Sequence, residues 1–143
     1  MRYQYFLASR YRNKDAVLDL ARKVKAKGKS YYCFIESEAS IKNVGSVESD
    51  PEAAMKRFES IPNWTKDARV REVFEMDMNA LKASEAIVVL LPAGKSVHIE
   101  AGAAYGFGKR LILVGEQKEA ESLYLIFDEF YPTIDAFIET LVP

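Results

Sequence analysis

Residues 85–115 read EAIVVLLPAGKSVHIEAGAAYGFGKRLILVG, in which two short apolar runs flank a polar turn and a segment of small residues. The runs 86–91 and 111–114 are too short for most helices and have the near-continuous apolar character of parallel strands covered on both faces. The small residues between them predict a helix whose backbone packs close to a sheet. They are Ala101, Gly102, Ala103, Ala104, Gly106 and Gly108. This segment therefore predicts a strand, a helix and a second, parallel strand.

The same alternation extends along the rest of the chain. Strands are expected at 3–8, 31–35, 86–91, 110–114 and 123–127. Helices are expected at 15–27, near 51–60, from Asn63 or Thr65 as N-cap to about residue 83, and at 133–141. Residues 36–51 are interpreted as a long polar loop of the kind that often forms a lid. With right-handed crossovers, this order predicts an α/β, three-layer flavodoxin-like (Rossmann-like) fold whose five-stranded parallel sheet has the order 2-1-3-4-5.

Length and composition limit the classes of protein. A chain of 143 residues, 49% of them apolar, predicts a single domain over residues 1–143. The 20 Lys and Arg nearly cancel the 21 Asp and Glu, so no overall charge recruits a nucleic acid polymer or a membrane surface. The only cysteine, Cys33, lies in an apolar run and is expected to be buried and unpaired. No hydrophobic signal core and no apolar run of about 20 residues is found, which predicts a cytoplasmic protein.

The predicted topology places a ligand-binding crevice. In sheets of this kind, ligands bind outside the carboxyl ends of the strands where the strand order reverses, here between the first and third strands. Residues 9–13 and 92–96 are therefore expected to face each other. Gly94, Lys95 and Ser96 lie where the third strand meets the next helix, and free N–H groups at a helix N-terminus favour anionic ligands.

Basic and aromatic residues follow the first strand. Arg10, Arg12 and Lys14 form a small basic cluster that is either solvated surface or a partner for phosphate. Tyr11 is either a core or rim aromatic or a platform for a base.

Two carboxylates are candidates for chemistry. Asp77 is in line with an apolar helical stripe, so it is expected to be paired, to open onto a cavity, or to reach water at the edge of the stripe. That stripe comprises Val70, Val73, Phe74 and Leu81. Glu100 is expected in the first turn of a helix, where the helix dipole alone stabilises an acid by about 0.3 to 1 kcal/mol. Two carboxylates that converge on one crevice are the minimum set for cleaving a glycosidic bond.

Other site types fit the sequence poorly. A P-loop requires glycine five residues before Gly94, where this chain has Val89. His98 is the only histidine, which excludes a histidine-rich metal site. The sequence predicts chemistry without a metal or redox cofactor.

Two segments together resemble the nucleoside 2-deoxyribosyltransferase family and its nucleotide N-glycosidase relatives. Residues 76–85, MDMNALKASE, are similar to the family's Asp-bearing helix, and residues 99–109, IEAGAAYGFGK, to its Glu-x-Gly-x-Ala…Gly-Lys helix. The resemblance implies that Glu100 is the nucleophile that attacks the anomeric carbon and that Asp77 is its carboxylate partner. It also matches Ser9 to a position after the first strand where some members use serine.

The resemblance has one departure and two further implications. The family usually has Asp or Ser six residues before the glutamate, where this chain has Gly94. Residues 92–100 also keep the spacing of the Pro-Gly-Gly-x-Gly-Thr-x-x-Glu motif of the cytokinin-activating phosphoribohydrolases, which cleave the same bond. The family builds sites completed by a neighbouring subunit, so the resemblance predicts a homo-oligomer, a dimer or larger. Aromatic residues that would line such a site are Phe127, Phe130 and Tyr131.

The sequence thus predicts an enzyme that cleaves or exchanges the N-glycosidic bond of a (deoxy)nucleoside or nucleoside 5′-monophosphate. Hydrolysis of a nucleotide is favoured over transfer, because the basic residues suit a 5′-phosphate. The expected substrate-binding residues are Ser9, Arg10, Tyr11, Arg12, Gly94, Lys95 and Ser96. The alternative is a non-catalytic module that binds a nucleotide or nucleotide-sugar, which the departure at Gly94 favours.

Overall fold

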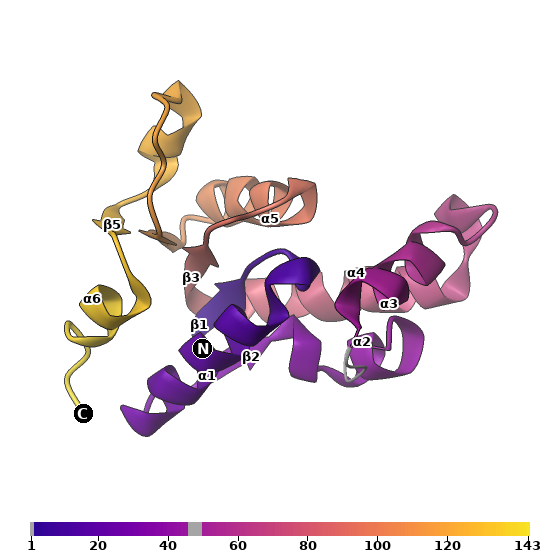
Figure 1. Cartoon of the computed structure of the whole chain (residues 1–143), viewed down its shortest axis with the longest axis horizontal. Coiled ribbons are helices and arrows are strands. Elements are labelled where there is room, and N and C mark those ends of the chain that lie inside the picture. The colour runs from indigo at the N-terminus through magenta and orange to yellow at the C-terminus, as the bar shows by residue number, and fades with distance from the viewer. Residues whose placement is uncertain (1, 46–49) are drawn as a thin grey trace.

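The computed structural model describes residues 2–45 and 50–143, which fold around one parallel sheet (Figure 1). Five strands pair in the order β2-β1-β3-β4-β5, and all four pairings are parallel. Their bounds are β1 Tyr3–Ala8, β2 Tyr31–Cys33, β3 Ser84–Leu90, β4 Arg110–Val114 and β5 Glu129–Tyr131. The predicted flavodoxin-like fold and its strand order are confirmed.

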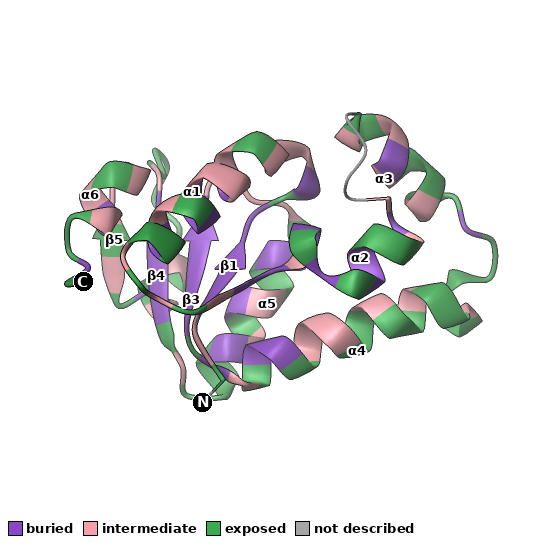
Figure 2. Cartoon of the chain, turned by 90° about the horizontal axis from the view of Figure 1, so that it is seen from below, coloured by how far each residue is buried: buried purple, intermediate pink, exposed green. Residues whose placement is uncertain are grey.

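Helices cover both faces of the sheet (Figure 2). One buried cluster joins the sheet to α1 (Lys14–Ala26) and α6 (Ile134–Ile138). A second cluster joins the opposite face to α4 (Ala68–Lys82) and α5 (Lys95–Gly106). Because every central strand is covered on both faces, its sequence is an almost unbroken apolar run rather than an alternating one.

Two short helices complete the end of the molecule that lies away from β4 and β5 (Figures 1 and 2). They are α2 (Glu38–Asn43) and α3 (Pro51–Glu59). A long loop is expected from the sequence over residues 36–51, and this expectation is wrong for residues 38–43, which form α2. Residues 46–49 of that range lie outside the described part of the chain. Ser37 starts α2 by accepting a hydrogen bond from the backbone N–H of Ser40, at 3.2 Å.

The expected fifth strand is also wrong. Residues 122–126 form a 3-10 turn, Ser122–Ile126, and the strand lies further on at β5. The carboxylate of Glu121 accepts a hydrogen bond from Leu123 N at 3.1 Å, which caps the turn. This run contains apolar residues of strand type, and the local cap outweighs their propensity.

The start of α4 differs from the expected N-cap. Asp67 caps this helix, and its Oδ1 accepts from the backbone N–H groups of Arg69 at 2.8 Å and Val70 at 3.3 Å. Asn63, one of the two residues expected in this role, adopts a left-handed conformation before a short 3-10 turn, and its side chain caps nothing. Asp67 provides the same chemistry four residues later, so α4 begins there.

The small residues of α5 do not all face the sheet as expected. Ala101 and Ala104 are buried against it, whereas Gly102 and Gly106 are exposed, with open space where a Cβ would stand. Gly108 has φ +74° just after the helix, a left-handed conformation that glycine adopts without strain. Close packing of α5 on the sheet therefore depends on its alanines. None of the helices built from described residues is long and apolar enough to cross a membrane.

Candidate active site

A cavity of about 310 Å³ opens at the carboxyl ends of β1 and β3. It lies at the strand-order reversal, as the topology predicts. All the residues expected at the site line it: Ser9, Arg10, Tyr11, Arg12, Asp77, Gly94, Lys95, Ser96 and Glu100. The structure therefore brings the predicted residues together from three separate parts of the chain.

Ser9 joins the two strand ends that form the floor. Its hydroxyl donates to the carbonyl of Leu90 at 2.9 Å and accepts from the side-chain amide of Asn13 at 3.0 Å. Ser9 is 2% exposed. These contacts hold the ends of β1 and β3 together, and a Cβ added at Gly94 would lie 3.8 Å from the Cβ of Arg10.

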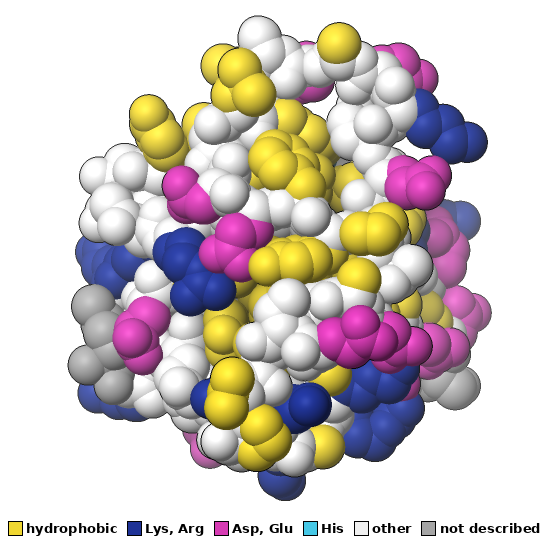
Figure 3. Space-filling view, turned by 90° about the vertical axis from the view of Figure 1, so that its left-hand side faces the viewer, with side chains coloured by type: hydrophobic (Ala, Val, Ile, Leu, Met, Phe, Trp, Pro, Cys, Tyr) yellow, Lys and Arg dark blue, Asp and Glu magenta, His cyan; other side chains and the backbone are white. Residues whose placement is uncertain are grey.

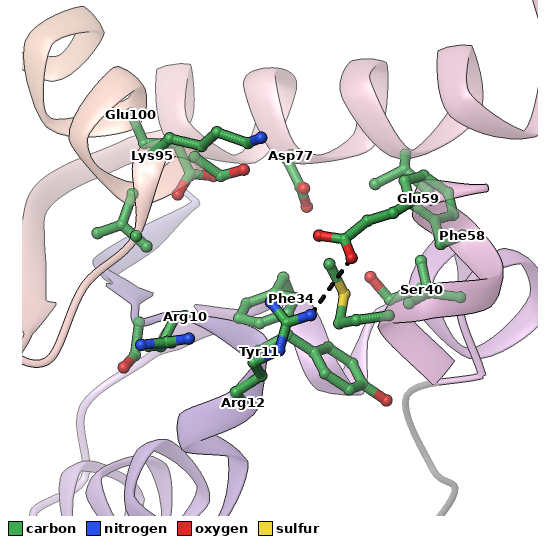
Figure 4. Close-up of a pocket in the computed structure, with 17 residues that line it drawn as sticks. Arg10, Tyr11, Arg12, Phe34, Ser40, Phe58, Glu59, Asp77, Lys95 and Glu100 are labelled. Atoms are coloured by element: carbon green, nitrogen blue, oxygen red, sulfur yellow. Dashed lines mark hydrogen bonds and ion pairs between the residues drawn. The ribbon is translucent and has the colours of Figure 1, made fainter. Parts of the chain in front are cut away.

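The two carboxylates enter the cavity from facing helices (Figure 4). Asp77 comes from α4 and Glu100 from α5. Glu100 is five residues after Lys95, where α5 begins, so the expectation that it lies in the first turn is wrong. Beyond the first turn, the exposed amide groups of the helix end do not explain an acid at this position.

The surroundings of this carboxylate pair favour protonation. Burial, and then the negative charge of Asp77, raise the pKa of Glu100 to about 8. Burial raises the pKa of Asp77 to about 6, against the lowering effect of a hydrogen bond from Tyr32. Near pH 7 the pair thus holds about one proton, since two neighbouring carboxylates in a low-dielectric site resist ionising together.

Tyr32 is a contact that the sequence analysis missed. Its hydroxyl donates to Oδ1 of Asp77 at 2.7 Å, although the two residues lie on β2 and α4. Tyr32 is 7% exposed, and its ring stacks on that of Phe6, with centroids 5.3 Å apart. Tyr32 lies within an apolar run, so in the sequence it looks like an ordinary core residue.

Tyr32→Phe is expected to raise the pKa of Asp77. The substitution removes a hydrogen bond that favours the ionised carboxylate and keeps the packed ring. The measurement is a carboxyl-carbon NMR titration of Asp77. Tyr31→Phe is the matched control, because Tyr31 donates instead to Glu36 at 2.9 Å. An Asp77 titration unchanged in Tyr32→Phe would show that the hydrogen bond has no electrostatic role.

Arg12 is engaged within the protein. Its Nε forms an ion pair with Glu52, and its Nη2 lies 3.3 Å from Oε1 of Glu59. Both glutamates belong to α3. Arg12 therefore ties α3 to the chain that follows β1. In the described part of the chain, Arg10 and Lys95 make no ion pair or side-chain hydrogen bond, so their charges remain for a ligand.

The far wall of the cavity is apolar, which the sequence analysis also missed. It is formed by Phe34, Val44, Met55, Phe58 and Val73. Tyr11 stands beside this wall, and its hydroxyl donates to the carbonyl of Gly45 at 3.1 Å. Periodicity marks these residues as core, and only the fold shows that they border a cavity. A planar ring with one polar edge fits such a wall.

Among the described residues, no group of three or more His, Cys, Asp and Glu side chains is arranged to hold a metal ion. His98 lies outside the cavity lining, and its ring nitrogens contact the carbonyl of Gly94 at 2.7 Å and the hydroxyl of Tyr124 at 2.9 Å. This histidine links α5 to the Ser122–Ile126 turn.

Comparisons with known proteins show a shared fold. No protein-family model matches the sequence, and no curated protein matches it. A 2-deoxyribosyltransferase of the psychrotolerant bacterium Bacillus psychrosaccharolyticus aligns over 97% of this chain and 96% of its own, with TM-score 0.62 and 14% identity. The CMP N-glycosidase of Clostridium botulinum aligns over 96% and 97%, with TM-score 0.55 and 18% identity. At the level of fold, both support the resemblance noted for residues 76–85 and 99–109.

Proposed function

We propose that this protein cleaves or exchanges the N-glycosidic bond of a (deoxy)nucleoside or nucleoside 5′-monophosphate, with Glu100 as nucleophile. The observation that carries the proposal is the pair of carboxylates, Glu100 and Asp77, that enter one cavity from facing helices. The two proteins that share the fold support it, since one is named a 2-deoxyribosyltransferase and the other a CMP N-glycosidase.

One proton shared by the pair is enough for a two-step reaction. In the free protein the higher pKa of Glu100 places the shared proton there, so the reaction requires this proton to move to Asp77 when the substrate binds. The ionised Glu100 carboxylate then attacks C1′ of the sugar, and Asp77 donates the proton to the departing base. The C1′–N bond breaks through an oxocarbenium-like transition state, and C1′ becomes bonded to Glu100. Water or a second base then attacks C1′, gives a proton to the Asp77 carboxylate, and releases the glutamate.

Charges at the mouth of the cavity favour a phosphorylated substrate. Arg10 and Lys95 supply cationic side chains, and the N-terminus of α5 supplies backbone N–H groups beside Gly94 and Ser96. A 5′-phosphate gains more from these groups than a 5′-hydroxyl does. We therefore favour hydrolysis of a nucleotide over exchange between nucleosides. Arg12 is paired with two glutamates of α3, so its charge is already balanced and Arg10 and Lys95 are the cations assigned to the phosphate.

The test is a panel of nucleosides and their 5′-monophosphates, each incubated with and without a second base. The proposal predicts release of free base, faster from the monophosphate, with little capture of the sugar by the added base. If the unphosphorylated nucleoside is the better substrate and the added base captures the sugar, transfer replaces hydrolysis as the reaction.

The second candidate function is a non-catalytic module that binds a nucleotide or nucleotide-sugar. Gly94 favours it, because a glycine there contributes no side chain where relatives by resemblance have Asp or Ser. Tight binding of a nucleotide without release of base over many hours would establish this candidate and remove the enzyme.

We also propose that the protein forms a homo-oligomer, a dimer or larger, in the cytoplasm. The face that carries β5 and α6 gathers apolar side chains (Figure 3), including Leu123, Leu125 and Phe130, which are 73%, 82% and 56% exposed. Of the other two aromatic residues expected to form a subunit wall, Phe127 is buried and Tyr131 is partly exposed. Light scattering at micromolar concentration is expected to give at least twice the chain mass, and a monomer mass refutes the oligomer.

The buried free thiol of Cys33 suits a reducing compartment.

A further inference from the structure

The cavity divides into a polar half and an apolar half, and this inference about the apolar half rests on the proposed function. Glu100 and Asp77 occupy the polar half, where the anomeric carbon must lie for attack. Met55 and Phe58 of α3 form part of the apolar half, beside Phe34. A sugar requires hydrogen-bonding partners and a base offers flat apolar faces. The base therefore belongs against the wall that α3 helps to form.

One charged side chain borders this apolar wall. Glu59 follows Phe58 at the end of α3, lines the cavity, and points toward Asp77 across it (Figure 4). Its side chain is 45% exposed. The contact of Oε1 with Nη2 of Arg12, at 3.3 Å, is the hydrogen bond found for this carboxylate within the described residues. Lone pairs of Glu59 therefore remain for a ligand in the cavity.

The position of this acid is fixed by the same arginine. Arg12 binds Glu52 and Glu59 together, and these residues lie about two turns apart on α3. Ala54, between them, is fully buried and anchors the helix to the core. Because Arg12 holds α3 near both of its ends, the carboxylate of Glu59 is fixed in place. A fixed hydrogen-bonding group discriminates between ligands better than a free surface acid does.

We propose that Glu59 is a specificity-determining residue that accepts a hydrogen bond from the exocyclic amino group of the substrate's base. A carboxylate has acceptors only, so it pairs with an amino group and opposes a carbonyl oxygen at the same ring position. Carboxylates read the amino group of cytosine in this way in protein–DNA complexes. The substrate class is then a nucleotide whose base carries an amino group, so that cytosine and adenine are preferred to their oxo counterparts, uracil and hypoxanthine.

The test measures binding, so that it does not depend on turnover. Dissociation constants for cytidine and uridine 5′-monophosphate are measured by calorimetry in a Glu100→Gln background, and the pair adenosine and inosine 5′-monophosphate is measured likewise. Each pair differs by one amino-to-carbonyl change. The proposal predicts about tenfold tighter binding of the amino member, which is the range for a hydrogen bond to a charged group. In Glu59→Gln the ratio of the two dissociation constants in each pair is expected to fall to about one, since an amide both donates and accepts.

Glu52→Gln is the matched control. Glu52 shares Arg12 with Glu59 but does not line the cavity. Glu52→Gln is therefore expected to leave the ratio of the dissociation constants unchanged. A ratio near one in the background protein, or a ratio that Glu59→Gln leaves unchanged, overturns the assignment to Glu59 and leaves the proposed function standing. An equal loss in Glu52→Gln shows that the placement of α3 sets the preference, and it also overturns the assignment. If none of the four nucleotides binds, the assignment to Glu59 fails, and release of base in the panel of nucleosides and monophosphates decides the proposed function separately.

Discussion

Glu100→Gln is expected to abolish release of base from the preferred nucleotide while the protein stays folded. The amide has nearly the shape of the carboxylate but cannot attack C1′, and losing a nucleophile costs about 10⁴-fold or more in turnover. The measurement is base release under saturating substrate, together with a thermal melt of the same preparation. Wild-type turnover in this variant would remove Glu100 from the mechanism.

The pH dependence of stability provides a second reading of the same variant. Because burial raises the pKa of Glu100 from 4.5 to about 8, the folded protein holds more protons than the unfolded chain between these values. The stability of the wild type must therefore fall as pH rises through this window, and glutamine removes that contribution. At pH 8 the variant is expected to melt at the same temperature as the wild type or a few degrees higher. A much lower melting temperature at pH 8 would mean that the ionised Glu100 stabilises the fold.

Asp77→Asn has the second largest expected effect. Activity should fall by about 10²- to 10⁴-fold, the range for loss of a general acid or base, because an amide cannot hold and release the proton of the pair. Stability should stay equal or rise, since the change removes an acid whose ionised form burial disfavours. The amide oxygen can still accept the hydrogen bond of Tyr32, so the local packing is kept.

A matched control lies on the same helix. Asp67 caps the N-terminus of α4 and does not line the cavity. Asp67→Ala should lower the melting temperature and leave the activity of each folded molecule unchanged. Asp77→Asn should thus lower activity without lowering stability, whereas Asp67→Ala should lower stability without lowering activity. A large loss of stability in Asp77→Asn with full activity would make Asp77 a structural residue.

The location of the site could be predicted from the sequence because it follows from topology. Right-handed crossovers between parallel strands decide which strand ends meet, and these ends carry Ser9 and Gly94. The helix that carries Glu100 can be predicted because it comes directly after the apolar run 86–91 in the sequence. Asp77 is a candidate from the sequence alone, because a carboxylate in line with an apolar stripe requires a partner or a cavity.

The contacts that modify this site could not be predicted in the same way. Tyr32 reaches Asp77 only because β2 places its ring under α4, and no periodicity in the sequence encodes that distance. Glu59 and Phe58 depend on where α3 lies over the cavity, which the ion pairs of Arg12 help to decide. The displaced fifth strand has a local cause, the cap by Glu121. These features follow from tertiary position and from caps, which sequence patterns specify weakly.

The most direct test of a glutamate nucleophile is the configuration of the product formed in the presence of methanol. A nucleotide with a β-glycosidic bond is turned over in dilute methanol, and the methyl glycoside is identified by NMR; methyl glycosides do not interconvert in water. Two displacements at C1′, through a bond to Glu100, predict the β-methyl glycoside. The α-methyl glycoside would show that the acceptor displaces the base in one step, and it would contradict the role of Glu100 as nucleophile.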